Sequence, residues 1–150
     1  MEFGRINLYG GVIVLVMLAP NIIYAFTNKD ADNKCTNKRL ILAEQIGRYG
    51  CIILMWLPLL IWKFAFPGAE WLLFYLLGNG VMLLVYLVIW ILYFKRKSPK
   101  KAMALAILPT GIFLFSGLLL HHWLLVAFSV IFGIAHISIT RINYQFVNRQ

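Results

Sequence analysis

The chain has 150 residues, of which 62% are hydrophobic and 13% are charged, and its mean hydropathy is +0.82. A water-soluble domain of this size could not cover so much apolar surface, so the composition indicates an integral membrane protein. The formal net charge of +9 would suggest nucleic acid as the partner of a soluble protein. Here the basic residues stand in clusters between apolar stretches, which is typical of cytoplasmic loops, and we expect no nucleic-acid partner.

Five apolar stretches are long enough to cross a membrane, since about 20 residues of helix span a hydrocarbon core of about 30 Å. They predict an all-α membrane protein, a bundle of five transmembrane helices forming a single domain over residues 1–150. The predicted spans are residues 7–26, 41–62, 71–94, 102–120 and 122–140.

The first two spans differ in character. Residues 7–26 are too uniform and too long for the core of a cleavable signal peptide. The polar stretch 27–39 carries four basic residues against two acidic ones and predicts a first cytoplasmic loop. The second span begins with the amphipathic sequence LILAEQIGRYG, and Pro58 should kink it or open a local gap in its backbone hydrogen bonds.

The third span precedes the strongest topological marker of the chain. Its first residue is Trp71, and it closes with Tyr93 near a lysine, as expected for an aromatic belt and a snorkelling base. KRKSPKK, residues 95–101, contains five basic residues and no acidic one, and it predicts a second cytoplasmic loop. The short, charge-poor connection between spans two and three belongs outside.

A short apolar turn separates the last two spans. One continuous helix over both would be about 58 Å long, too long for a single crossing, so His121-His122-Trp123 predicts a tight external turn. Pro109-Thr110-Gly111 interrupts the fourth span, and Arg141 and Arg149 mark the inner end of the fifth. If successive spans cross the membrane in alternating directions, all basic segments fall on one side. This places the N-terminus outside and the C-terminus in the cytoplasm.

Polar and small residues recur at helical spacing and indicate the faces that turn toward the bundle interior. In the third span this face carries Tyr75, Asn79, Tyr86 and Tyr93. In the fifth span it carries Ser129, Gly133 and His136. We expect the opposite face of the fifth span to contact lipid through Leu125, Phe128 and Phe132.

Ionisable residues within spans are rare and are candidates for function. Glu44 and Arg48 are four residues apart on one helix face, and Asn21 and His136 lie at a similar depth, so the four predict one intramembrane polar cluster. Asn79 is a secondary candidate. The alternative is that Glu44 and Arg48 form an ion pair at the cytoplasmic interface and that the other residues make interhelical hydrogen bonds.

Signatures of metal, cofactor and catalytic sites are absent from the sequence. Cys35 and Cys51 have neither CxxC nor paired-His spacing, and the adjacent His121 and His122 point to different faces. There is no HExxH, no glycine-rich phosphate loop and no GxSxG. We therefore expect no metal, no cofactor and no assigned catalytic residue.

Three function classes remain open. The first is a non-enzymatic accessory, immunity or assembly component, which needs only a topology and packing surfaces. The second is a small-solute transporter or channel, in which prolines in the spans would free backbone carbonyls. The third is a membrane-embedded enzyme that uses Glu44 or His136 as acid or base. The expected partners are the lipid bilayer, anionic headgroups at the basic loops, and a membrane protein or a second copy, and the expected location is a bacterial plasma membrane.

Overall fold

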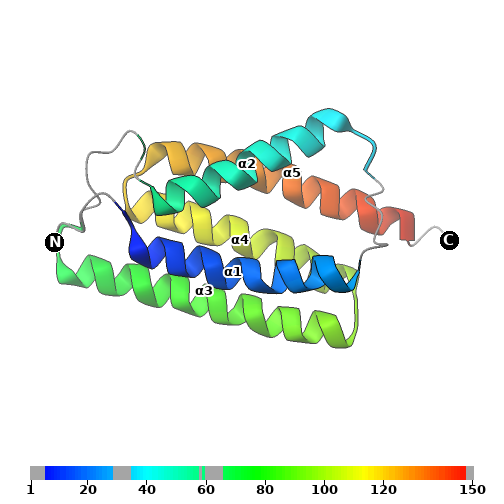
Figure 1. Ribbon diagram of the computed structural model, residues 1–150, viewed down its shortest axis with the longest axis horizontal. Coiled ribbons are helices and arrows are strands. Elements are labelled where there is room, and N and C mark those ends of the chain that lie inside the picture. Colours follow the sequence, from blue (N-terminus) through cyan, green and yellow to red (C-terminus); the bar gives the residue numbers. More distant parts are fainter. Residues whose placement is uncertain (1–5, 29–34, 58, 60–65, 148–150) are drawn as a thin grey trace.

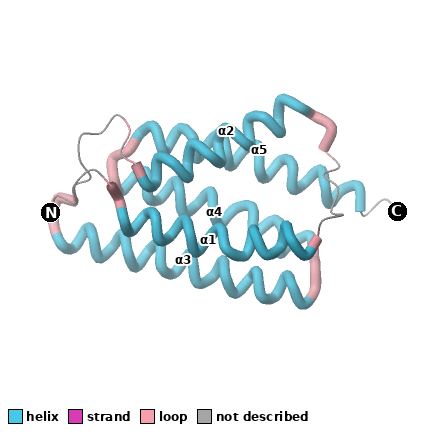
Figure 2. The backbone as a smooth tube through the Cα atoms, in the orientation of Figure 1, coloured by secondary structure: helices cyan, strands magenta, loops and turns pink. Residues whose placement is uncertain are grey.

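The computed structural model describes residues 6–28, 35–57, 59 and 66–147, and over these ranges the chain is entirely helical, with no strand. Figure 1 shows the helices lying roughly side by side and alternating in direction along the chain. Their bounds are α1 Leu8–Thr27, α2 Lys38–Trp56, α3 Ala69–Lys95, α4 Pro99–Leu119 and α5 Trp123–Val147. Figure 2 shows the turns gathered at the two ends of the bundle.

Four of the described helices, α1, α3, α4 and α5, are long and apolar enough to cross a membrane. The exception is α2, whose first half carries Lys38, Arg39, Glu44 and Arg48. The predicted second span differs from this helix at both ends. The helix begins at Lys38, and it ends at Trp56, after which Leu57 is extended. Pro58, where we predicted a kink, lies outside the described residues.

The helix ends are capped by side chains that the sequence places at these positions. Asn7 accepts a hydrogen bond from the backbone N–H of Gly10 at 3.0 Å, and Asn37 and Ser98 cap α2 and α4 in the same way. Pro99 occupies the first turn of α4, where a missing N–H costs nothing. Each cap satisfies a donor that would otherwise be unpaired, so these residues define where the helices begin.

The predicted turn between the last two helices is confirmed. α4 ends at Leu119 and α5 begins at Trp123, and His121 reverses the chain with a φ of 51°. The fifth helix then continues to Val147, beyond the predicted end at Thr140, because Arg141 lies on an exposed helix face rather than after the helix.

Two pairs of helices and a central helix make up the bundle. α1 packs against α3, α2 packs against α5, and α4 lies between them in contact with α3 and α5 (Figure 1). The predicted interior face of α3 is confirmed, since Tyr75, Asn79, Tyr86 and Tyr93 are all buried. Its other face is exposed and apolar, as a lipid-facing surface would be, at Leu73, Leu77, Val81, Leu84, Val88 and Ile91.

The predicted lipid-facing side of α5 is wrong in part. Leu125 and Phe132 are buried, at 0% and 3% exposure, and Phe128 is half-buried. The physical reason is that α5 is packed between two neighbours, with α4 on one side and α2 on the other. Because α5 has a neighbour on two sides, it buries apolar residues in addition to those of its polar stripe.

Candidate functional site

Glu44 is the centre of a polar cluster formed by α2 and α5. Its side chain is only 7% exposed, because the charged half of α2 packs onto α5. One carboxylate oxygen, Oε1, accepts a hydrogen bond from Nη2 of Arg48, one turn further along α2. The same oxygen lies 3.1 Å from Nδ1 of His136 on α5. We call Glu44, Arg48 and His136 the triad.

The imidazole of His136 is held in place from two sides. Its ring stacks on Phe132, with 4.9 Å between ring centroids and an interplanar angle of 19°. Its Nδ1 meets the carboxylate of Glu44, and a neutral imidazole donates only from a nitrogen that carries the proton. The pairing therefore favours the tautomer protonated at Nδ1, which leaves Nε2 as an acceptor.

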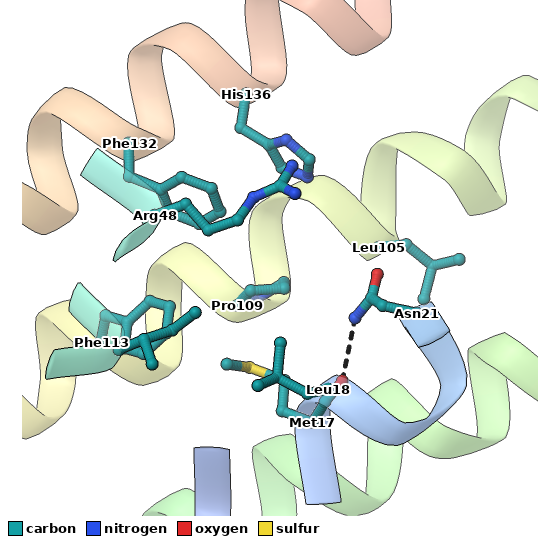
Figure 3. Close-up of a pocket in the computed structure, with 10 residues that line it drawn as sticks. Met17, Leu18, Asn21, Arg48, Leu105, Pro109, Phe113, Phe132 and His136 are labelled. Atoms are coloured by element: carbon teal, nitrogen blue, oxygen red, sulfur yellow. Dashed lines mark hydrogen bonds between the residues drawn. The ribbon is translucent and has the colours of Figure 1, made fainter. Parts of the chain in front are cut away.

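A cavity of about 70 Å³ lies beside the triad (Figure 3). Four helices contribute to its wall, which is mostly apolar and has three polar side chains, Asn21, Arg48 and His136. The apolar lining consists of Met17, Leu18, Ile52, Leu105, Pro109, Phe113 and Phe132. Glu44 is not part of the lining, so Arg48 and His136 stand between its carboxylate and the cavity.

Asn21 lies across the cavity from the triad and makes no hydrogen bond to it. Its amide nitrogen donates to the backbone oxygen of Met17 at 2.9 Å and to the hydroxyl of Tyr86 at 2.6 Å. With the nitrogen engaged in this way, the amide oxygen points toward the side of the cavity that Arg48 and His136 occupy (Figure 3). The cavity thus has hydrogen-bond donors on one wall and an acceptor on the other.

Pro109 leaves one backbone carbonyl of α4 without its usual helical hydrogen bond. Proline has no N–H, so the carbonyl of Leu105, four residues earlier, cannot receive the usual helical hydrogen bond. α4 nevertheless continues through Pro109, and α1 continues through Pro20, so neither helix is broken. Both Leu105 and Pro109 line the cavity.

The cavity lies where α1 and α2 separate. At one end of the bundle they are joined, since the backbone N–H of Asn7 donates to the carbonyl of Trp56 at 2.9 Å. Figure 1 shows them diverging toward the other end, which we call the basic end because the connection from Lys95 to Lys101 lies there. Arg48, although paired with Glu44, keeps 44% of its side chain exposed at this opening.

Asn79, the secondary candidate, belongs to a different part of the bundle. Its amide oxygen accepts a hydrogen bond from Ser116 of α4 at 3.0 Å, and its nitrogen donates to the backbone oxygen of Tyr75. Asn79 and Ser116 are both fully buried. The arrangement ties α3 to α4 and leaves no polar atom of Asn79 facing the cavity.

Sequence reasoning missed the residue that holds Asn21 in place. Tyr86 was assigned to the interior face of its helix, but nothing in the spacing indicated that it would bind Asn21. The carbonyl that Pro109 leaves without a helical hydrogen bond was anticipated from the prolines in the spans. Within the described ranges, no group of three or more His, Cys, Asp or Glu side chains is placed to hold a metal ion.

The fold and the site define a class, a helical bundle with apolar helices of membrane-spanning length and a polar cavity between them. Comparisons with protein-family models, with curated proteins and with solved structures find no match to this chain.

Proposed function

We propose that this chain is a five-span membrane protein of a bacterial plasma membrane, with its N-terminus outside and its C-terminus in the cytoplasm. The support is the distribution of charge, because cytoplasmic loops carry an excess of lysine and arginine. At the basic end of the bundle lie Lys38, Arg39, Lys95, Arg96, Lys97, Lys100, Lys101 and Arg141. Glu70 begins α3 at the opposite end.

In this proposal α2 also crosses the membrane, as the second of five spans, although its first half is charged. Its 19 residues extend over about 28 Å, close to the thickness of the hydrocarbon core. The charges that lower its hydropathy are compensated inside the protein, since Glu44 is paired with both Arg48 and His136. A neutralised pair on a helix that packs against a neighbour is tolerated in a membrane.

The function we propose is that of a non-enzymatic membrane component, an accessory, immunity or assembly protein. One observation carries this, namely that Glu44 is 7% exposed and already bound by two partners. A general acid or base must reach the proton that it transfers, and this carboxylate is covered by its own partners. The pairing therefore supports a fixed interior more than an enzyme active site.

A small-solute transporter or channel is the second candidate, and the cavity favours it. Polar side chains from three helices line one space together with Pro109, and transporter sites are often built where helices are irregular. An enzyme is the third candidate and has the least support, because Glu44 is covered by its partners and, of the two acid–base residues described in the triad, this leaves only His136, whose side chain is 26% exposed.

The test is purification in a mild detergent, followed by measurement of the mass of the complex and identification of its components. An accessory component is expected to run as a stoichiometric complex with a membrane protein or a second copy. The same preparation, reconstituted alone into vesicles, is expected to show no solute flux. A monodisperse single copy that conducts ions or solutes would contradict the accessory function and support the transporter.

A further inference from the structure

Arg48 is a half-exposed cation placed deep in a helical bundle. Tyr86, which holds Asn21 at the level of the cavity, lies nine residues before Lys95 on α3, or about 14 Å along the helix. An extended arginine reaches only part of this distance toward the surface. In a membrane a guanidinium at this depth is costly unless water or a polar group covers it. Glu44 binds one of its nitrogens, 44% of the side chain is exposed, and Arg48 lines the cavity.

The size of the cavity limits what can occupy it. Sites for drug-sized molecules have volumes of about 300–1,000 Å³, whereas one water molecule needs roughly 10–15 Å³ of comparable space. At about 70 Å³ the cavity holds a few waters or one compact polar group, and no extended metabolite. The guanidinium fork suits a planar or tetrahedral oxyanion, on which it makes two parallel hydrogen bonds.

We propose that this cavity binds one phosphate group, with Arg48 as its anchor, at the opening between α1 and α2. Arg48 has five N–H groups, of which Glu44 occupies only Nη2. The guanidinium projects into the space between His136, Pro109 and Asn21 (Figure 3). Glu44 does not line the cavity, so its negative charge is screened from the ligand by its two partners.

The ligand would bring a negative charge to a place where the protein's own charges are already paired. Glu44 and Arg48 are oppositely charged and bound to each other, so the anion must be held by the N–H groups of Arg48 that Glu44 leaves free. Among the described residues, the charged groups facing His136 are Glu44 and Arg48 of α2, and the linings from α1 and α4 contain no ionisable side chain.

A phosphate group could come from a lipid headgroup or from the cytoplasm. The cavity admits the phosphate of a lipid headgroup, and the acyl chains would then remain outside it in the bilayer. A free phosphate ion would instead enter through the basic end. Both sources share the same contact with Arg48, and the inference holds for an accessory component and for a transporter.

The test measures the melting temperature of the full-length protein in detergent against three probes. These are inorganic phosphate, dioctanoyl phosphatidylglycerol, and dioctanoylglycerol, which has the same chains and no phosphate. We expect stabilisation by one or both phosphate probes and none by dioctanoylglycerol. Stabilisation by both probes or by inorganic phosphate alone identifies a site open to the free ion, and stabilisation by phosphatidylglycerol alone identifies a headgroup site.

Variants separate the cavity from the basic surface. Arg48→Lys keeps the charge but loses the fork, and we expect it to weaken binding roughly 10- to 100-fold, as for loss of a charged hydrogen bond. Leu18→Trp should fill the cavity and abolish binding with the triad intact, which covers the case in which Arg48→Lys does not fold. Lys100→Gln, at an exposed basic position in the first turn of α4, is the control and should bind as the parent does.

Three outcomes would overturn the proposal. The first is that neither phosphate probe stabilises the protein. The second is that Lys100→Gln weakens binding as much as the cavity variants do, which would mean attraction by the basic surface alone. The third is that Leu18→Trp binds as tightly as the parent.

Discussion

Gly47 of α2 lies directly against the backbone of Phe132 in α5. A Cβ atom on Gly47 would stand 2.8 Å from the Cα of Phe132 and 2.7 Å from its backbone nitrogen, closer than real Cβ contacts allow. This contact is one turn from Glu44 on α2 and one turn from His136 on α5. The absence of a side chain at Gly47 therefore lets the two helices approach closely enough for the triad to form.

Gly47→Ala should lower stability by about 1–3 kcal/mol, because the backbone of α5 must move to admit the methyl group. The measurement is the melting temperature in detergent. Gly80→Ala is the matched control, since a Cβ there meets nothing within 4 Å, and alanine favours helix slightly over glycine. Equal effects of the two substitutions would contradict the close packing of α2 on α5.

Glu44 and Arg48 should be energetically coupled. Arg48→Gln leaves the buried carboxylate without the cation that neutralises it, whereas adding Glu44→Gln removes the uncompensated charge. The double variant should therefore be more stable than the sum of the single effects predicts, by about 1–2 kcal/mol. Thermal melting of the four proteins of the cycle gives this value. Strictly additive effects would mean that the two side chains do not interact. Glu70→Gln is the control, and because this carboxylate is exposed we expect the melting temperature to be unchanged.

Gly133→Ala should be rescued by Thr110→Ser. A Cβ on Gly133 would lie 2.4 Å from Cγ2 of Thr110, and serine lacks that methyl group while it retains the hydroxyl. We expect Gly133→Ala alone to lower the melting temperature and the double variant to recover most of the loss. Thr110→Ser alone serves as the reference. If the double variant is no more stable than Gly133→Ala, the clash does not involve Cγ2 of Thr110.

His122 should make the protein sensitive to acid. It is 1% exposed in the turn between α4 and α5, and its Nδ1 accepts a hydrogen bond from the backbone N–H of Leu125 at 3.3 Å. Burial lowers the pKa of His122 below its usual value of 6.5, so the folded protein holds it neutral while the unfolded chain protonates it. Stability from this residue is therefore present above pH 6.5 and is lost as the pH falls below that value.

His122→Asn keeps a cap acceptor without a titrating group, so its melting temperature should depend less on pH between 8 and 5 than that of the parent. The control is His121→Asn, because asparagine tolerates the positive φ of that position. If the parent and the His122→Asn variant show the same pH dependence, His122 is not the residue that makes the protein sensitive to acid.

Cysteine labelling should report the proposed orientation. Cys35 is buried, at 4% exposure, so it is a poor probe, and exposed positions in a cysteine-free background are better. Glu70→Cys should react with a membrane-impermeant maleimide in intact cells, and Lys100→Cys should react only after the membrane is opened. The reverse pattern would invert the topology.

The helical class, the turn at His121 and His122 and the buried face of α3 were predictable from the sequence. The physical reason is that each depends on local information. A run of apolar residues long enough to span a membrane specifies a helix, a length limit specifies the turn, and a stripe at helical spacing specifies the buried face of a helix with neighbours on one side.

The extent of burial on α5 and the shape of the cavity depended on tertiary structure. Phe132 is buried because Gly47 brings a second helix against it, and no pattern within α5 records that partner. Likewise, the spacing of Glu44 and Arg48 predicted their contact, but only the packing of α2 on α5 brought His136 to the same carboxylate oxygen. Sequence periodicity determined which side chains share a helix face, whereas the close approaches between helices decided which faces meet and where a space is left between them.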